Sequence, residues 1–153
     1  MLSNMKKSII ILMAAILSTA TISACSGNTT AETSTETINT KDATHVEIIY
    51  FHGKQRCKTC IAIENETKAL FEGELAELVK SGKVRLRIVD FSTPEGKQIA
   101  KKYKVTFSSL FVVTNPGKNE TAEDLTRFAF ANARSNPEAF RKEVKSKVMN
   151  GIK

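Results

Sequence analysis

Residues 45–60 read HVEIIYFHGKQRCKTC, a strand pattern followed closely by two cysteines that are separated by two residues. The apolar run that ends at Phe51 is typical of a strand buried on both faces. Cys57 and Cys60 then open a segment with helical periodicity, where backbone N–H groups are unpaired and the helix dipole is positive. Both features favour the thiolate, which is the form of cysteine that attacks disulfides. This placement predicts a redox-active dithiol.

Cys25, the remaining cysteine, has a different explanation. Lys6 and Lys7 precede an apolar segment at 9–17 that is too short for a good transmembrane helix, and small or polar residues follow it. Residues 1–24 are therefore typical of a secretory signal. The sequence ISAC, which ends at Cys25, looks like the lipobox of bacterial lipoproteins. We expect cleavage before Cys25, acyl chains such as palmitate on that cysteine, and a location outside the reducing cytosol, where disulfides persist. The alternative is an ordinary secreted protein that is cleaved elsewhere.

Composition divides the rest of the chain into a tether and one domain. Residues 25–44 are rich in Thr, Ser, Glu and Asn, with Ile38 as the only large apolar residue, and such a stretch favours a flexible tether. The alternative is an arm packed on the domain. Residues 45–153 suffice for a single core. Ser26 is not the aspartate that retains some lipoproteins at the inner membrane, which favours a periplasm-facing site on the outer membrane.

Apolar periodicity gives the order of elements in the domain. Helical spacing over 58–79 predicts a helix that Gly73 kinks or divides, and a cap and proline at 92–94 predict a second helix that ends near Lys102 and buries Ile99, Ala100 and Tyr103. Strands are expected at 45–51, 84–91 and 110–113. Alternation of Thr126, Phe128 and Phe130 with Arg127 predicts a fourth strand after a turn at 115–118. A last helix begins at 136–138 and presents Phe140, Val144 and Val148.

The resulting order, β-α-β-α-β-β-α, predicts an α/β fold. A strand–helix–strand connection requires a parallel pair, and the short turn near Pro116 requires an antiparallel pair. A four-stranded mixed sheet with helices on both faces satisfies both requirements. This order, with Cys57 and Cys60 between the first strand and the first helix, resembles the thioredoxin superfamily over the whole domain. Residues 50–53 (YFHG), 56–60 (RCKTC) and 62–64 (AIE) are also similar to ArsF-type thioredoxin-like lipoproteins, known as a nitrophenyl-compound nitroreductase subunit.

The resemblance implies a role for each cysteine. Cys57 would be the exposed attacking residue and Cys60 the more buried resolving residue, in exchange with a dithiol or disulfide of a partner protein. Arg56 and Lys58 flank the attacking sulfur and are expected to favour its thiolate, unless they are simply solvated surface cations. No bound organic cofactor is implied.

Three departures from the thioredoxin pattern affect the expected site. Gln55-Arg56 replaces the tryptophan that thioredoxins commonly carry beside the first cysteine, and Phe51-His52 replaces a buried aspartate. The segment 106–110 contains no proline, although the superfamily usually places a cis-proline there, facing the cysteines. Either Ser108 or Ser109 is expected at that position, which changes the surface presented to substrates.

The two cysteines are also compatible with functions other than thiol–disulfide exchange. Two thiolates also suit zinc, copper(I) or arsenite, with His52 as a third ligand, a proton partner of the thiols or merely a turn residue beside Gly53. A purely structural disulfide is a weaker alternative, because so small a ring removes little entropy from the unfolded chain. Nothing resembles a flavin or nicotinamide site, so in a nitroreductase system this chain would supply electrons or bind alongside a flavoprotein.

The net charge is +7, and it falls to +5 without residues 1–24, which hold two lysines and no acid. The basic residues are interspersed with acids, apart from a modest group at 141–147. This group is expected to be a solvated helix face, and the alternative is attraction of a tethered basic domain to a membrane surface. No interleaved aromatic motif supports binding to nucleic acid.

Overall fold

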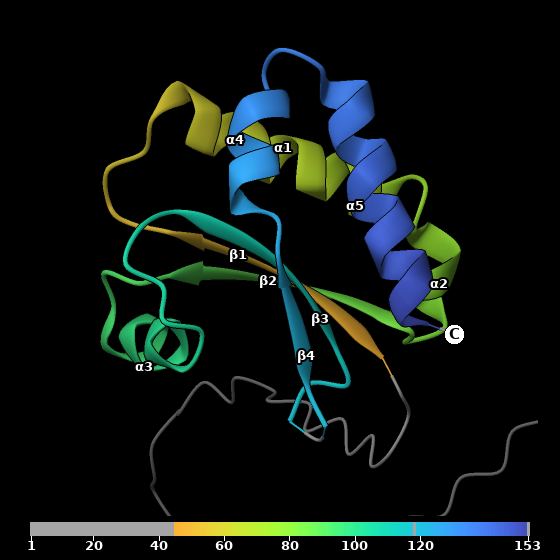
Figure 1. Cartoon of the computed structure of the whole chain (residues 1–153), viewed down its shortest axis with the longest axis horizontal. Helices are drawn as coiled ribbons and strands as arrows, with labels where there is room; N and C mark the ends of the chain where they lie inside the picture. The colour runs from red at the N-terminus through yellow and green to blue at the C-terminus, as the bar shows by residue number, and fades with distance from the viewer. Residues whose placement is uncertain (1–44, 118, 153) are drawn as a thin grey trace, which may run out of the picture. The chain divides into compact units, whose positions relative to one another are not determined.

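The computed structural model describes residues 45–117 and 119–152, and the predicted signal, Cys25 and the tether lie outside them. The described chain forms four strands and five helices in the order β1-α1-α2-β2-α3-β3-β4-α4-α5 (Figure 1). The strands are β1 (Val46–His52), β2 (Val84–Asp90), β3 (Ser109–Thr114) and β4 (Thr121–Asp124). The helices are α1 (Lys58–Glu72), α2 (Ala76–Lys80), α3 (Pro94–Lys102), α4 (Thr126–Asn132) and α5 (Pro137–Gly151).

The sheet is mixed, with the strand order β2-β1-β3-β4. β1 pairs in parallel with β2, and β3 is antiparallel to both β1 and β4. Because β1 is central, its apolar run is buried on both faces, as the sequence predicts. The α/β class and the four-stranded mixed sheet are confirmed.

Helices cover both faces of the sheet and divide the core in two. Alternate residues of β1 face opposite sides: Tyr50 packs in the larger cluster with residues of α1, α4 and α5, whereas Phe51 packs in the smaller cluster beside α3. The predicted stripe of α5, Phe140, Val144 and Val148, is fully buried in the larger cluster. Figure 1 shows α3 alone on one side of the sheet and α1, α4 and α5 on the other.

Helix α3 begins as its sequence predicts. The side chain of Thr93 accepts a hydrogen bond from the Gly96 amide at 3.1 Å, and Pro94 occupies the first turn. A Cβ at Gly96 would lie 1.9 Å from the carbonyl oxygen of Asp90, so only glycine permits this close approach of α3 to the end of β2. Ala100 is buried, and Ile99 and Tyr103 are half-buried against the smaller cluster.

The break between α1 and α2 confirms the division predicted at Gly73. The amide of Gly73 donates to the carbonyl of Ala69, and α2 begins three residues later at Ala76. A Cβ at Gly73 would lie only 2.9 Å from the same carbonyl oxygen.

The fourth strand is not where the sequence predicts it. Residues 126–132 form helix α4, and the strand that pairs with β3 is β4, at 121–124. Leu125, Ala129 and Ala133 are buried at four-residue spacing, which is helical periodicity. The alternating phenylalanines favoured a strand prediction over this helical pattern. β4 is exposed throughout and reads TAED, so it lacks the apolar alternation of a half-buried strand. A polar edge strand of this kind also resists pairing with other chains.

Candidate functional site

The two cysteines lie where β1 leads into α1. Cys57 is the N-cap residue of α1, with φ −77° and ψ 164°, and its Sγ accepts a hydrogen bond from the Cys60 amide at 3.1 Å. That amide is one of the helix N–H groups that lack an intrahelical partner. The sulfur of Cys57 therefore occupies the position at which a negative charge is stabilised by the helix terminus.

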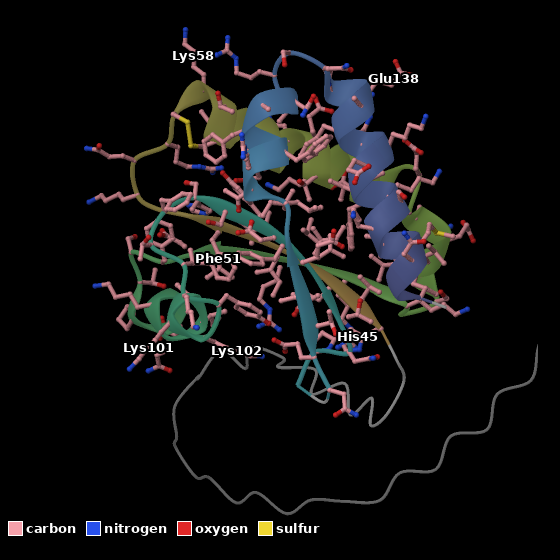
Figure 2. All side chains as sticks on the ribbon, viewed as in Figure 1. His45, Phe51, Lys58, Lys101, Lys102 and Glu138 are labelled. Carbon is pink, nitrogen blue, oxygen red and sulfur yellow. A yellow bond between two sulfur atoms is a disulfide. The ribbon has the colours of Figure 1, made fainter. Side chains whose placement is uncertain are left out.

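Cys57 and Cys60 form a disulfide, visible as the yellow bond near Lys58 in Figure 2. Their Cα atoms are 5.0 Å apart, within the usual range for bonded cysteines. Cys57 is exposed, whereas Cys60 is only 6% exposed. An incoming group from solvent therefore reaches the first sulfur more readily than the second.

Tyr50 is the buried polar residue next to the dithiol. Its hydroxyl donates a hydrogen bond of 2.8 Å to the carbonyl oxygen of Cys60 and so fastens the first turn of α1 to the central strand. Burial raises the pKa of Tyr50, although Arg56 and Ser108 act in the opposite direction. The phenol is thus a neutral hydrogen-bond donor near neutral pH, and it holds the backbone of the second cysteine in place.

Arg56 is engaged with an acid of α1. Its guanidinium forms an ion pair with Glu64 and lies over the ring of Tyr50, with Cζ 5.8 Å from the ring centroid. The contact with Glu64 is an ion pair rather than a directed hydrogen bond, and Arg56 Nε has no hydrogen-bond partner among the described residues. The positive charge predicted to favour the Cys57 thiolate is therefore compensated by Glu64, whereas Lys58 is exposed at the start of α1.

Glu64 also accepts a hydrogen bond from Lys68, with Nζ and Oε1 2.6 Å apart. Burial alone would raise the pKa of Glu64, but the hydrogen bond from Lys68 and the ion pair with Arg56 outweigh burial and lower it. The same pairing raises the pKa of Arg56, against the effect of its own burial. Both groups are charged at neutral pH, and together they tie the segment before Cys57 to α1.

The two candidate serines differ in where their side chains lie. Ser109 is buried at the start of β3, opposite Phe51, and its hydroxyl donates to the carbonyl of Phe107 at 2.9 Å. Ser108 is half-buried and interacts with the hydroxyl of Tyr50. Ser108 therefore contacts the tyrosine that holds the Cys60 carbonyl. Phe107, just before it, is 62% exposed and presents a large apolar side chain. All described peptide bonds are trans.

His52 contacts residues close to it in the sequence. Its Nδ1 lies 3.1 Å from the carbonyl oxygen of Gly53, which is the turn contact expected as one alternative, and its ring centroid is 6.1 Å from that of Tyr50. Within the described part of the chain, no three His, Cys, Asp or Glu side chains are grouped so that they could hold a metal ion. A soft metal here would have the two thiolates as its ligands.

The position of the disulfide and the strand order now decide the architecture. A central β1 is followed by the disulfide and α1, a parallel β2 flanks it on one side, and an antiparallel β3 flanks it on the other. The fold is thioredoxin-like. Helix α4 is an addition between the last strand and the last helix of the predicted order.

Comparison with known proteins gives remote likenesses only. No protein-family model matches the chain, and no curated protein matches it. Among solved structures, a thioredoxin from Thermus thermophilus is 18% identical, with a TM-score of 0.42 over 70% of this chain and 76% of that one. A structure described as a malarial protein is 18% identical, with a TM-score of 0.36 over 57% of this chain and 93% of that one. The thioredoxin-like assignment rests on topology, and the narrower resemblance to nitroreductase-subunit lipoproteins is not supported.

Tyr50 and Glu64 were not predicted as site residues. Tyr50 alternates with Val46 and Ile48 on the face that α1 covers, and a buried tyrosine hydroxyl requires a partner. Glu64 lies one helical turn after Cys60, on the same side of α1. These two spacings were the available sequence signals for a role at the site. Neither spacing identifies the group that Tyr50 or Glu64 contacts.

Proposed function

We propose that this protein is a membrane-anchored thiol–disulfide oxidoreductase that exchanges disulfides with an extracytoplasmic partner protein. The observation that carries the proposal is the exposed Cys57 sulfur, held at the N-terminus of α1 by the Cys60 amide and bonded to a buried second cysteine. An accessible thiolate and a resolving thiol within reach of it are the two components that exchange requires.

In the reducing direction, the Cys57 thiolate attacks one sulfur of a partner disulfide, forms a mixed disulfide and releases the other partner sulfur as a thiolate. Cys60 loses its proton and attacks Cys57 Sγ, which closes the intramolecular disulfide and releases the partner's remaining thiolate. Two electrons and, after protonation of the released thiolates, two protons pass to the partner. The same steps in reverse oxidise a partner dithiol.

The anchor in this proposal is Cys25, which lies outside the described residues. Across 45–117 and 119–152, no helix is long and apolar enough to span a membrane. The support for anchoring is the lipobox-like sequence at 22–25, and the acidic and hydroxylated tether gives the domain reach from the membrane surface.

A Cys60→Ser variant of the full-length chain tests exchange and anchoring together. Without the resolving thiol, mixed disulfides on Cys57 persist, so we expect reducible adducts in the membrane fraction of producing cells on non-reducing gels. Adding Cys25→Ala moves these adducts to the soluble fraction. If Cys57→Ser traps mixed disulfides and Cys60→Ser does not, the attacking and resolving roles of the two cysteines are reversed. Adducts that remain membrane-bound after Cys25→Ala contradict the anchor.

A further inference from the structure

A groove of about 620 Å³ lies beside the C-terminal half of α3. Its apolar lining comes from Phe91, Ala100 and Val105, and its charged lining consists of Lys97, Lys101 and Lys104. We call it the lysine groove. No acidic residue of the described chain lines the lysine groove, so its surface combines an apolar floor with positive charges alone.

The charges of the groove are uncompensated within the described chain. Lys97, Lys101 and Lys104 are exposed, and none of them forms an ion pair with a described residue. By contrast, the neighbouring Lys102 pairs with Glu120 at 2.6 Å. Lys97 and Lys101 are four residues apart on one helix face, where like charges destabilise a helix. A partner with negative charge would relieve this repulsion.

Lys104 adopts a backbone conformation that is unusual for lysine. Its φ is +56°, at the residue that follows the C-cap Tyr103 of α3, where glycine or asparagine is the common choice. A residue with a Cβ is strained there, and such strain is concentrated at functional positions. The third lysine of the groove is therefore placed at a cost in local stability.

The groove and the disulfide lie at the same edge of the sheet. The amide of Phe91 donates to the carbonyl of His52, and a Cβ on Gly53 would lie 3.1 Å from the Phe91 ring. Phe91 therefore contacts the start of the loop that leads to Cys57. On the other side, Thr106 lines the groove and Phe107 follows it. Figure 2 shows α3 and the yellow disulfide at the same end of the sheet.

We propose that the lysine groove binds an acidic segment of the redox partner protein and so selects which disulfides reach Cys57. The inference rests on the proposed exchange function and adds the chemistry of the partner. Glutamate or aspartate side chains would pair with the three lysines, while an apolar side chain would contact Phe91, Ala100 and Val105. An apolar floor at the same end of the sheet as the dithiol suits a protein segment better than it suits a flat membrane surface.

The test uses the full-length chain, with dithiothreitol as electron donor and two disulfide peptides of equal length. One peptide carries glutamates beside its disulfide and the other carries glutamines. We expect kcat/KM to be about tenfold higher for the acidic peptide at low salt, since three weak ion pairs sum to that order. In the triple variant Lys97→Gln, Lys101→Gln, Lys104→Gln, the ratio of the two kcat/KM values falls to near one.

A second triple variant, Lys80→Gln, Lys83→Gln, Lys142→Gln, has the same change in net charge at exposed sites outside the groove, and it keeps the preference. An equal loss of preference in both triple variants overturns the proposal, because net charge alone would explain it. The groove variant could instead keep its preference for the acidic peptide but no longer bind phosphatidylglycerol vesicles. That result would assign the groove to lipid and would also overturn the proposal. If wild-type protein reduces neither peptide, the exchange function itself fails.

Discussion

Replacing Cys57 with serine is expected to abolish disulfide exchange while the fold remains intact. The variant keeps the N-cap, because a serine hydroxyl also accepts a hydrogen bond from a helix amide. The remaining thiol, Cys60, is only 6% exposed, and its carbonyl is held by Tyr50. Exchange with a peptide disulfide should therefore fall to the uncatalysed rate, as measured by the release of peptide thiol over time.

Cys25→Ala is the matched control for this prediction. It also removes one cysteine, but one in the proposed anchor segment, and it should leave the exchange rate of solubilised protein unchanged. Substantial exchange by Cys57→Ser would show that Cys60 reaches substrates directly, and the assignment of attacking and resolving cysteines would be wrong.

Glu64→Gln is expected to lower the free energy of unfolding by about 2 kcal/mol at neutral pH, the typical contribution of hydrogen bonds to charged groups. Glu64 is 12% exposed and contacts both Arg56 and Lys68. Its pKa in the folded protein is lowered from the ordinary value of 4.5, so its contribution is fully present above that value. The contribution is lost as the pH falls from there through the folded pKa, so the difference between wild type and variant should narrow in acid. Urea unfolding over a pH series measures this.

Glu77→Gln provides the comparison for Glu64→Gln. Glu77 is 87% exposed and pairs with Lys80, which is 73% exposed, so solvent screens the pair and the change should be within about 0.5 kcal/mol. Two results would show that Glu64 is not held as an ionised partner of Arg56. One is equal destabilisation by Glu64→Gln and Glu77→Gln. The other is a stability difference between wild type and Glu64→Gln that widens as the pH falls.

Local patterns in the sequence were sufficient to predict a structural feature where the physical cause of that feature is itself local. The apolar residues of β1 are consecutive in the sequence, and the start of α3 is determined by Thr93 and Pro94. The placement of Cys57 at a helix start follows from the change of periodicity after residue 56. Each of these features depends on neighbours in sequence, so the order of the first six elements could be predicted.

The features that sequence could not supply depend on contacts between distant segments. β4 is a strand only because it pairs with β3, since nothing in TAED favours an extended conformation through burial. The cation of Arg56 was expected to act on Cys57, but its geometry is determined by Glu64 on the next helix. The lysine groove likewise requires Phe91 and Val105 to converge on α3, which only the folded chain brings about.

The measurement that tests redox activity most directly is the reduction potential of the Cys57–Cys60 pair in the full-length protein. The protein is equilibrated in glutathione buffers, alkylated, and analysed by mass spectrometry of the fragment that contains both cysteines. We predict a reversible two-electron couple between about −120 and −270 mV, the range of working thiol–disulfide exchangers. A pair that stays oxidised at potentials below about −300 mV would be a structural disulfide and would contradict the proposed function.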